Sequence, residues 1–260
     1  MCRIACHIAT FLALALGLAA CQITPANLAP EQAARIRTLA IVSTVNDNWL
    51  WENKGFLAFA RTRTVNKADW RLAERVRNVT RTALAKSYSL VPAPPGIDSP
   101  PSSTRSQGRQ RLMDALARMA FRPDAVLLIE HGTYGTPRNV QNASSYMVGL
   151  GVYRTTHLFE EYVSLYTMLS FEVIDGKTGV SLALFDAVMP NSAPFSGPSF
   201  GDDPLPFIFL NYPDERRIIT TWTDSFDDQP VTSSNAVRAA FYDFIDKSIP
   251  FTLRKSGLLR

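Results

Sequence analysis

A serine inside the motif GPSFG, at positions 197–201, has the spacing of the nucleophile elbow that many hydrolases use. Such an elbow needs a strand directly before the serine and a helix directly after it, because the tight turn must lift the hydroxyl above a sheet. Pro198 lies inside the motif and two more prolines follow closely, so no helix can begin there. All three histidines precede Ser199, whereas the elbow has the order serine, acid, histidine. We therefore expect Ser199 to lie in a loop turn, with a serine hydrolase that uses it as an alternative.

Two histidines have carboxylates beside them: His131 follows Glu130, and His157 precedes Glu160 and Glu161. Imidazole and carboxylate are common zinc ligands, but a zinc site draws on three or four of them. No second spaced pair accompanies either histidine. We therefore expect no metal, no cofactor and no enzymatic activity.

The first 20 residues have the character of a secretory signal peptide. Arg3 precedes an uncharged apolar run at 8–20, which is shorter than the roughly 20 residues that a membrane-spanning helix needs. The run ends in LAAC at 18–21, which resembles the lipobox of bacterial lipoproteins. This resemblance implies cleavage before Cys21 and a lipid, palmitate included, on Cys21. The alternatives are an ordinary signal peptide with an A-x-A-like cleavage site, or an uncleaved anchor.

Cysteine usage agrees with the lipoprotein interpretation. Cys2 and Cys6 would leave with the signal peptide, so Cys21 alone would remain and no intramolecular disulfide could form. In the lipoprotein family, a residue other than aspartate after the cysteine, here Gln22, implies transfer to the outer membrane. The expected location is therefore the outer membrane, with the lipid on Cys21 as the anchor and the protein facing the periplasm.

The charge balance argues against a nucleic-acid partner. Without Arg3 the chain has 26 Lys+Arg and 23 Asp+Glu, a net charge of 26 minus 23, or +3. So small an excess is not typical of a nucleic-acid-binding protein. The 46% of hydrophobic residues is ample for a folded core.

Hydrophobic periodicity predicts a tether at 21–36 and one α/β (α+β) domain at 37–260, with a mixed sheet and helices packed on it. The expected elements are a strand at 39–42, a strand or hairpin at 49–63, a helix at about 68–86, a strand at 88–91, a helix at about 106–119, a central strand at 125–129, a long hairpin at 162–184 and a helix from about 234. Inserts are expected near 144–159 and 190–213, the second being rich in proline.

Three local patterns make the prediction specific. Asn66 is expected to cap the helix at 68–86, with Asp69 as its capping-box partner. Around the turn at 175–179, Val180 and the residues two and four positions on are expected to share one face of the returning strand. The last helix is expected to end or kink at Pro250.

A family resemblance accompanies these elements. The stretches WRLAERVRNVTRTALAKSYSLVPA, PDAVLLIEHG and LSFEVIDGKTGVSLA resemble a periplasmic domain shared by three groups of envelope proteins. These are the curli-secretion lipoproteins, the penicillin-binding-protein-activator lipoproteins and the amino-terminal domain of the Tol-system propeller protein. The resemblance covers about 37–188 and implies a helix-covered sheet. The segments at 144–159 and 190–213 depart from the compact members.

The segment SSYMVGLGVYRTTHLF, at 144–159, alternates like a strand with one apolar face backed by small residues. The apolar face comprises Tyr146, Val148, Leu150 and Val152. We expect this segment to bind a partner. In the curli-secretion family, inserts in this domain form pore hairpins, so a secretion or pore subunit that forms a homo-oligomer is the alternative.

Two further surfaces have open interpretations. Trp49, Trp51, Phe56 and Phe59 form either core or a partner-binding edge, because aromatic side chains bury large areas in both settings. Arginines on the helix at 68–86 form either a solvated face or a surface for lipid phosphates or an anionic cell-wall polymer. The function expected from the sequence is a non-enzymatic binding or assembly role in the cell envelope, with another envelope protein or a cell-wall polymer as partner.

Overall fold

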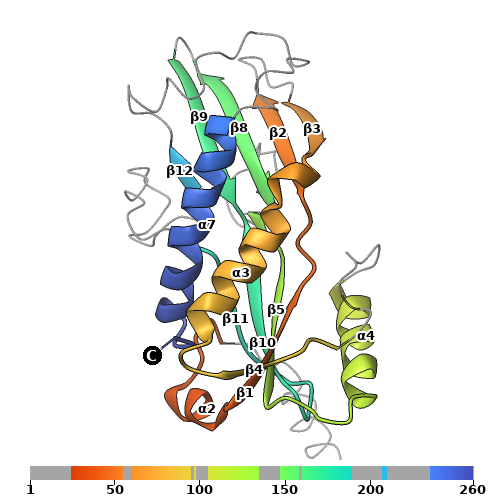
Figure 1. The fold of residues 1–260 in the computed structure, drawn as a ribbon. Coiled ribbons are helices and arrows are strands. Elements are labelled where there is room, and N and C mark those ends of the chain that lie inside the picture. The colour runs from red at the N-terminus through yellow and green to blue at the C-terminus, as the bar shows by residue number, and fades with distance from the viewer. Residues whose placement is uncertain are drawn as a thin grey trace, which may run out of the picture.

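A computed structural model describes residues 25–54, 60–94, 97, 105–134, 147–157, 160–188, 207–209 and 235–259. Two five-stranded sheets lie one above the other, and two long helices run along one side of both (Figure 1). The predicted α/β class, with mixed sheets covered by helices, is confirmed.

The first sheet has the strand order β11-β10-β5-β1-β4. Its strands are β1 (Thr38–Ser43), β4 (Ser89–Val91), β5 (Ala125–His131), β10 (Leu169–Asp175) and β11 (Ser181–Asp186). β5 is central, as its unbroken apolar sequence predicts, and the structure pairs it parallel to β1 and antiparallel to β10. All of Ala125 to Ile129 is buried, because helices cover both faces of this sheet.

The second sheet has the order β12-β9-β8-β2-β3. Its strands are β2 (Asn48–Lys54), β3 (Ala60–Asn66), β8 (Leu150–His157), β9 (Glu160–Thr167) and β12 (Phe207–Phe209). β2 and β3 form the hairpin expected over 49–63. A short third sheet pairs β6 (Thr133–Tyr134) with β7 (Met147–Val148) beside the junction of the two larger sheets.

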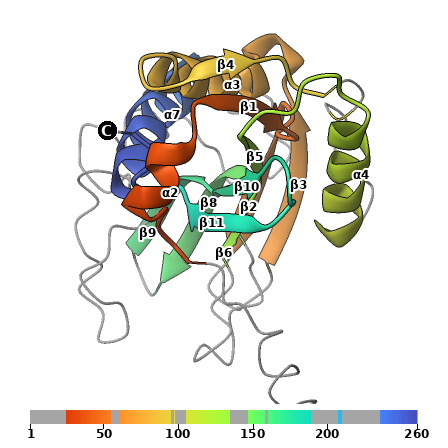
Figure 2. The same ribbon diagram turned by 90° about the horizontal axis from the view of Figure 1, so that it is seen from below.

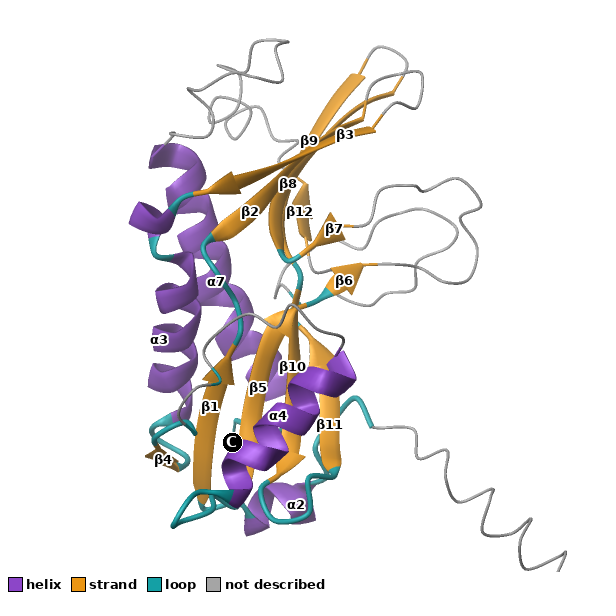
Figure 3. Ribbon diagram, turned by 90° about the vertical axis from the view of Figure 1, so that its right-hand side faces the viewer, coloured by secondary structure: helices purple, strands orange, loops and turns teal. Residues whose placement is uncertain are grey.

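Three helices cover the sheets. The helices α3 (Leu72–Leu84) and α7 (Asn235–Lys255) pack on one side, and α4 (Arg105–Ala117) packs on the opposite face of the first sheet (Figure 3). Leu112 and Leu116 of α4 join Val126 and Leu128 in a separate hydrophobic cluster there. The larger core lies between the sheets and the α3–α7 pair. α7 is about 30 Å long at 1.5 Å per residue, so it runs along both sheets.

The segment expected to be a tether is partly folded. α2 (Pro30–Arg35) lies under the lower end of the first sheet, between α7 and β11 (Figure 2). Leu28 and Ala33 are buried, and the Leu28 N–H donates to the Ser256 oxygen at 2.8 Å. The described fold therefore begins at Pro25 rather than near Arg37. The two prolines suggested a coil, but contacts with the distant C-terminal end of α7 order this segment.

The start of the helix expected at 68–86 also differs. A 3₁₀ turn, η1 (Ala68–Trp70), comes first, and Arg71 then has φ 49°, a left-handed conformation that separates it from α3. Asn66 does not cap the helix but donates to Asn48 across the hairpin at 2.8 Å. Asp47 takes that role instead, since its carboxylate accepts from the Ala73 N–H at 2.9 Å.

The chain expected as one long strand from 162 to 173 divides at Met168. β9 belongs to the second sheet and β10 to the first, because Met168 bonds to the glycines of two other junction segments. The turn at 175–179 forms as predicted, but the face prediction after it is wrong. Val180 is 47% exposed, whereas Ala183 and Phe185 are buried. An irregularity between Val173 and Ile174 shifts the pairing by one residue and thereby exchanges the faces.

The face of the last helix is confirmed, since Val237, Phe241, Phe244 and Ile245 are all buried. The expected end at Pro250 is not observed, because α7 continues to Lys255. Ile249 and Leu253, on either side of the proline, are fully buried. Their packing in the core offsets the backbone hydrogen bond that Pro250 cannot make.

Candidate functional site

A buried carboxyl group lies in the second sheet, on the face away from the helices. Glu52 of β2 is 3% exposed, and it accepts a hydrogen bond of 2.6 Å from the hydroxyl of Tyr166 on β9. Burial raises the pKa of Glu52, against the lowering effect of the tyrosine hydrogen bond. Burial and the nearby carboxylate also raise the pKa of Tyr166, so its hydroxyl remains a donor. This pair links two strands that are not neighbours in the sheet.

Glycines in the segment at 144–159 make room for this arrangement. A Cβ on Gly151 would lie 2.1 Å from the Tyr166 ring, so the ring can cross β8 only over a glycine. A Cβ on Gly149 would lie 2.6 Å from His131, and Gly149 has φ +64°. The small residues of the alternating pattern therefore accommodate large side chains of the same molecule.

The structure places the predicted partner-binding residues mostly inside the fold. Leu150 and Val152 are 0% and 1% exposed and face the helices, while Val148 is half-buried. The backbone of Val148 hydrogen-bonds to Tyr166. Within the segment at 144–159, β8 is paired on both sides, with β2 and with β9. Tyr146 lies outside the described residues.

The predicted aromatic cluster forms core at Trp49 and Trp51. Trp49 is 0% exposed and stacks on Trp70 at a centroid distance of 5.8 Å, with Phe241 of α7 at 5.7 Å. Trp51 is 6% exposed. These contacts join the β2–β3 hairpin to η1 and to α7. Phe56, Phe59, Ser199 and Cys21, the residue predicted to carry a lipid, lie outside the described residues.

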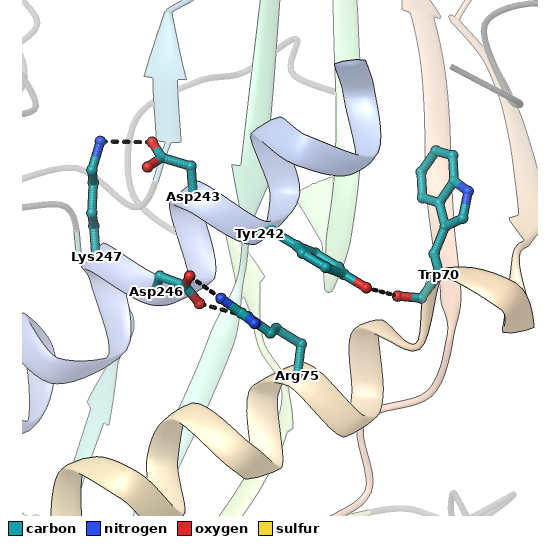
Figure 4. Close-up of polar contacts among 6 residues, drawn as sticks. All are labelled: Trp70, Arg75, Tyr242, Asp243, Asp246 and Lys247. Atoms are coloured by element: carbon teal, nitrogen blue, oxygen red, sulfur yellow. Dashed lines mark hydrogen bonds and ion pairs between the residues drawn. The ribbon is translucent and has the colours of Figure 1, made fainter. Parts of the chain in front are cut away.

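The basic surface of α3 is partly engaged in contacts within the molecule. Arg75 pairs with Asp246 of α7 and lies over the Tyr242 ring at 5.0 Å (Figure 4). The Tyr242 hydroxyl donates to the Trp70 oxygen, so the same residues tie α7 to the start of α3 (Figure 4). Arg71 is exposed and pairs with Glu74 at 3.5 Å. Arg75 therefore serves the helix interface rather than a ligand.

A polar hollow of 270 Å³ lies at the lower end of the first sheet, beside α2. Its charged lining comes from Arg35 of α2, Asp124 before β5, Asp175 at the end of β10 and Lys177 in the following turn. Gln32, Ile36 and Leu182 complete it. The parallel start of β1 and β5 and the end of antiparallel β10 meet at this edge, which brings these distant residues together.

The two carboxylates of the hollow are bonded in the same way. One oxygen of Asp124 accepts from the Arg37 and Thr38 N–H groups and from the Thr38 hydroxyl, each at 3.0 Å. One oxygen of Asp175 accepts from the Lys177 and Thr178 N–H groups, at 2.9 and 2.7 Å, and from the Thr178 hydroxyl at 2.9 Å. Among the described residues, the second oxygen of each carboxylate has no hydrogen-bond donor.

These bonds keep both groups ionised. The Thr38 N–H, followed by the Arg37 N–H and Lys177, lowers the pKa of Asp124. Burial alone would raise the pKa of Asp175, but the bonds from Thr178 and Lys177 outweigh it and lower the pKa. The hollow thus presents two negative groups beside the cations Arg35 and Lys177. Ionised acids are poor proton donors near neutral pH, so this arrangement suits binding better than acid catalysis.

β3 forms one edge of the second sheet, because β2 is its sole partner among the described strands. Thr62, Thr64 and Asn66 are exposed along it, while Val65 between them is buried in the core. An edge strand can pair with an extended segment of another chain.

Sequence reasoning missed Glu52, Tyr166 and the hollow. Glu52 occupies an outward position of the alternating strand WLWEN, next to the core residue Trp51, and only its burial distinguishes it from an ordinary exposed glutamate. Asp175 was visible as a turn residue, but its proximity to Asp124 depends on strand order. Neither a helix with the length and apolar character for crossing a membrane nor a metal-binding cluster occurs within the described ranges.

Comparison with known proteins finds only low sequence identity. No protein family model and no curated protein matches the sequence. The chain is similar to the lipoprotein GNA1162 from Neisseria meningitidis, with 13% identity, 58% of this chain and 80% of that chain covered, and a TM-score of 0.24. It is also similar to the protein XCC0632 from Xanthomonas campestris, of the DUF330 family, with 9% identity, coverages of 85% and 88%, and a TM-score of 0.26.

Proposed function

We propose that this chain is a bacterial outer-membrane lipoprotein that binds another envelope component and is not an enzyme. Its signal peptide would be cleaved before Cys21, and the lipid on Cys21 would hold the protein to the membrane on the periplasmic side. The observation that carries this proposal is the attachment of Pro25 to the fold. Its oxygen accepts from the Leu184 N–H of β11 at 2.9 Å, four residues after the lipobox cysteine.

This attachment orients the protein. Four residues extend to at most about 14 Å, so the lipid on Cys21 would lie close to the lower end of the first sheet. The second sheet lies at the other end of the molecule, beside the amino-terminal part of α7 (Figure 1). A lipid anchor at Cys21 would therefore place the first sheet at the membrane and present the second sheet to the periplasm.

The β3 edge is the surface that best suits a protein partner. It is an edge strand with three exposed polar side chains, and Trp49 fixes its hairpin on η1 and α7. A preformed edge loses little entropy when a partner strand pairs with it. The predicted partner residues Trp49 and Trp51 would act indirectly, by holding this edge in position.

Two observations support binding rather than catalysis. The Glu52–Tyr166 pair is closed to a substrate, with exposures of 3% and 0%. The accessible carboxylates, Asp124 and Asp175, have lowered pKa values and stay ionised. Replacement of Ser199 by alanine, with ester and amide turnover as the readout, tests the hydrolase alternative directly.

The proposal is tested by photocrosslinking in cells with a photoreactive residue at Thr64 of β3. A matched control carries the same residue at Arg81, an exposed position on α3. We expect one reproducible envelope adduct from Thr64 and none from Arg81. In the same cells, Cys21→Ser should release the protein from the membrane. Equal adducts at both positions would refute the β3 surface, and membrane retention of Cys21→Ser would refute the lipid anchor.

A further inference from the structure

The hollow beside α2 combines both signs of charge in a small volume. Asp124 and Asp175 each keep one oxygen without a protein donor, and Lys177 lies close enough to both carboxylates to influence them. Within the described part of the chain, the side chains of Arg35 and Lys177 have no ion-pair partner. The hollow therefore has acceptors and donors that no described protein group satisfies.

A simple ion does not match this lining. A metal cation would meet two carboxylates, but Lys177 repels it and no third acidic or histidine ligand is present in the described ranges. A phosphate alone would satisfy Arg35 and Lys177 but would be repelled by both carboxylates. The lining is complementary to a ligand that carries an anion and a primary ammonium a few bonds apart.

We propose that the hollow binds the phosphoethanolamine headgroup of a membrane phospholipid. The phosphate pairs with Arg35 and Lys177, and the ammonium donates to the open oxygens of Asp124 and Asp175. Gln32 supplies an additional amide at the rim. Primary ammonium is essential, because the three methyl groups of choline remove every N–H that the carboxylates could accept.

The source of this headgroup follows from the position of the hollow, and this step rests on the proposed lipid anchor. Leu182 lines the hollow, and Leu184, two residues on in β11, binds the Pro25 oxygen. The attached lipid would thus hold the hollow at the membrane surface, where headgroups are concentrated. A weak site suffices there, because tethering makes the second contact effectively intramolecular.

The test uses the full-length lipidated protein in maltoside micelles and saturation-transfer NMR with soluble headgroups. We expect glycerophosphoethanolamine to bind with a millimolar dissociation constant, and glycerophosphocholine, inorganic phosphate and glycine to bind at least tenfold more weakly. The double variant R35E/K177E should lose at least tenfold in affinity. The control R81E/K86E makes the same charge change on exposed residues of and after α3 and should bind as the wild type does.

Each outcome decides a separate point. Equal binding of glycerophosphocholine would overturn the role of the two carboxylates, and equal binding of glycine would overturn a lipid as the ligand. Unchanged binding by R35E/K177E would overturn the site. The mass of the same sample reports whether Cys21 carries lipid, so failure of the anchor is distinguishable from failure of the hollow.

Discussion

The two large sheets are similar in strand number but differ in what covers them. The first sheet lies between helices on both faces, and its central strands are filled with aliphatic side chains. The second sheet has helices on one face only, and the other face holds Glu52 under the Tyr166 ring. Apolar burial stabilises both faces of the first sheet but only the helix-facing side of the second, whose other face depends on the Glu52–Tyr166 bond and on Gly151. This difference agrees with the proposed orientation, in which the first sheet faces the membrane and the second binds a partner.

The largest expected effect comes from Trp49→Ala. Loss of a fully buried tryptophan should lower the free energy of unfolding by about 4 kcal/mol. In native-state hydrogen exchange, amides of β2 and β3 should lose more protection than those of β1 and β5. Phe171→Ala, in the first sheet, is the matched control and should reverse this pattern. Uniform loss of protection in both variants would contradict separate stabilisation of the two sheets.

Gly151→Ala should have the next largest effect. Its new Cβ would lie 2.1 Å from Tyr166, and the resulting overpacking should cost about 3 kcal/mol in chemical denaturation. Gly132→Ala is the control, because its Cβ would meet nothing closer than 3.3 Å and should cost less. Trimming the ring with Tyr166→Leu should recover part of the loss in Gly151→Ala. Similar losses for both glycines would show that the ring crossing is unimportant.

Glu52→Gln should stabilise the protein by about 1–2 kcal/mol at pH 7, because it removes a buried carboxyl group that would otherwise ionise. The folded-state pKa of Glu52 is raised above 4.5, so the unfolded chain releases this proton first as the pH rises. The wild type therefore loses stability as the pH rises from about 4.5 through the folded-state pKa. Urea unfolding at pH 4 and pH 7 should show a difference between variant and wild type only at pH 7. An equal difference at both pH values would contradict this account.

The smallest expected effect concerns the contact between α3 and α7. A double-mutant cycle of Arg75→Met and Asp246→Asn should give a coupling energy of up to about 1 kcal/mol, since the two side chains are 39% and 37% exposed. The Asp243–Lys247 pair within α7 is 56–57% exposed and should give about 0.3 kcal/mol (Figure 4). A larger coupling for Asp243 and Lys247 would mean that helix pairing does not depend on Arg75.

Much of the first sheet could be predicted from the sequence because its signals are local. An unbroken apolar run predicted the central strand β5, and helical periodicity predicted the buried face of α7. Such local patterns do not predict structure that depends on contacts between residues far apart in the sequence. Leu28 packs against the end of α7. The chain passes from the second sheet to the first at Met168, whose backbone hydrogen-bonds to Gly132 and Gly149. No local pattern indicates either event.

The candidate site was harder to predict for the same reason. The alternation at 144–159 correctly indicated a strand with one apolar face, but a sequence cannot say whether a partner or the molecule's own helices cover Leu150 and Val152. The hollow depends on strand order, since it joins residues from α2, from before β5 and from both ends of the β10–β11 turn. Only its turn chemistry, at Asp175, was visible in advance.

The most direct test of the account is the depth of two spin labels on the lipidated protein bound to vesicles. Cys21 would be occupied by lipid and Cys2 and Cys6 removed, so a single new cysteine at Lys177 or at Thr64 would be the only labelling site in the mature chain. In the proposed orientation, the label at Lys177 should lie at the headgroup layer, while the label at Thr64 should lie in bulk water. A label at Thr64 as close to the membrane as that at Lys177 would contradict the proposed orientation.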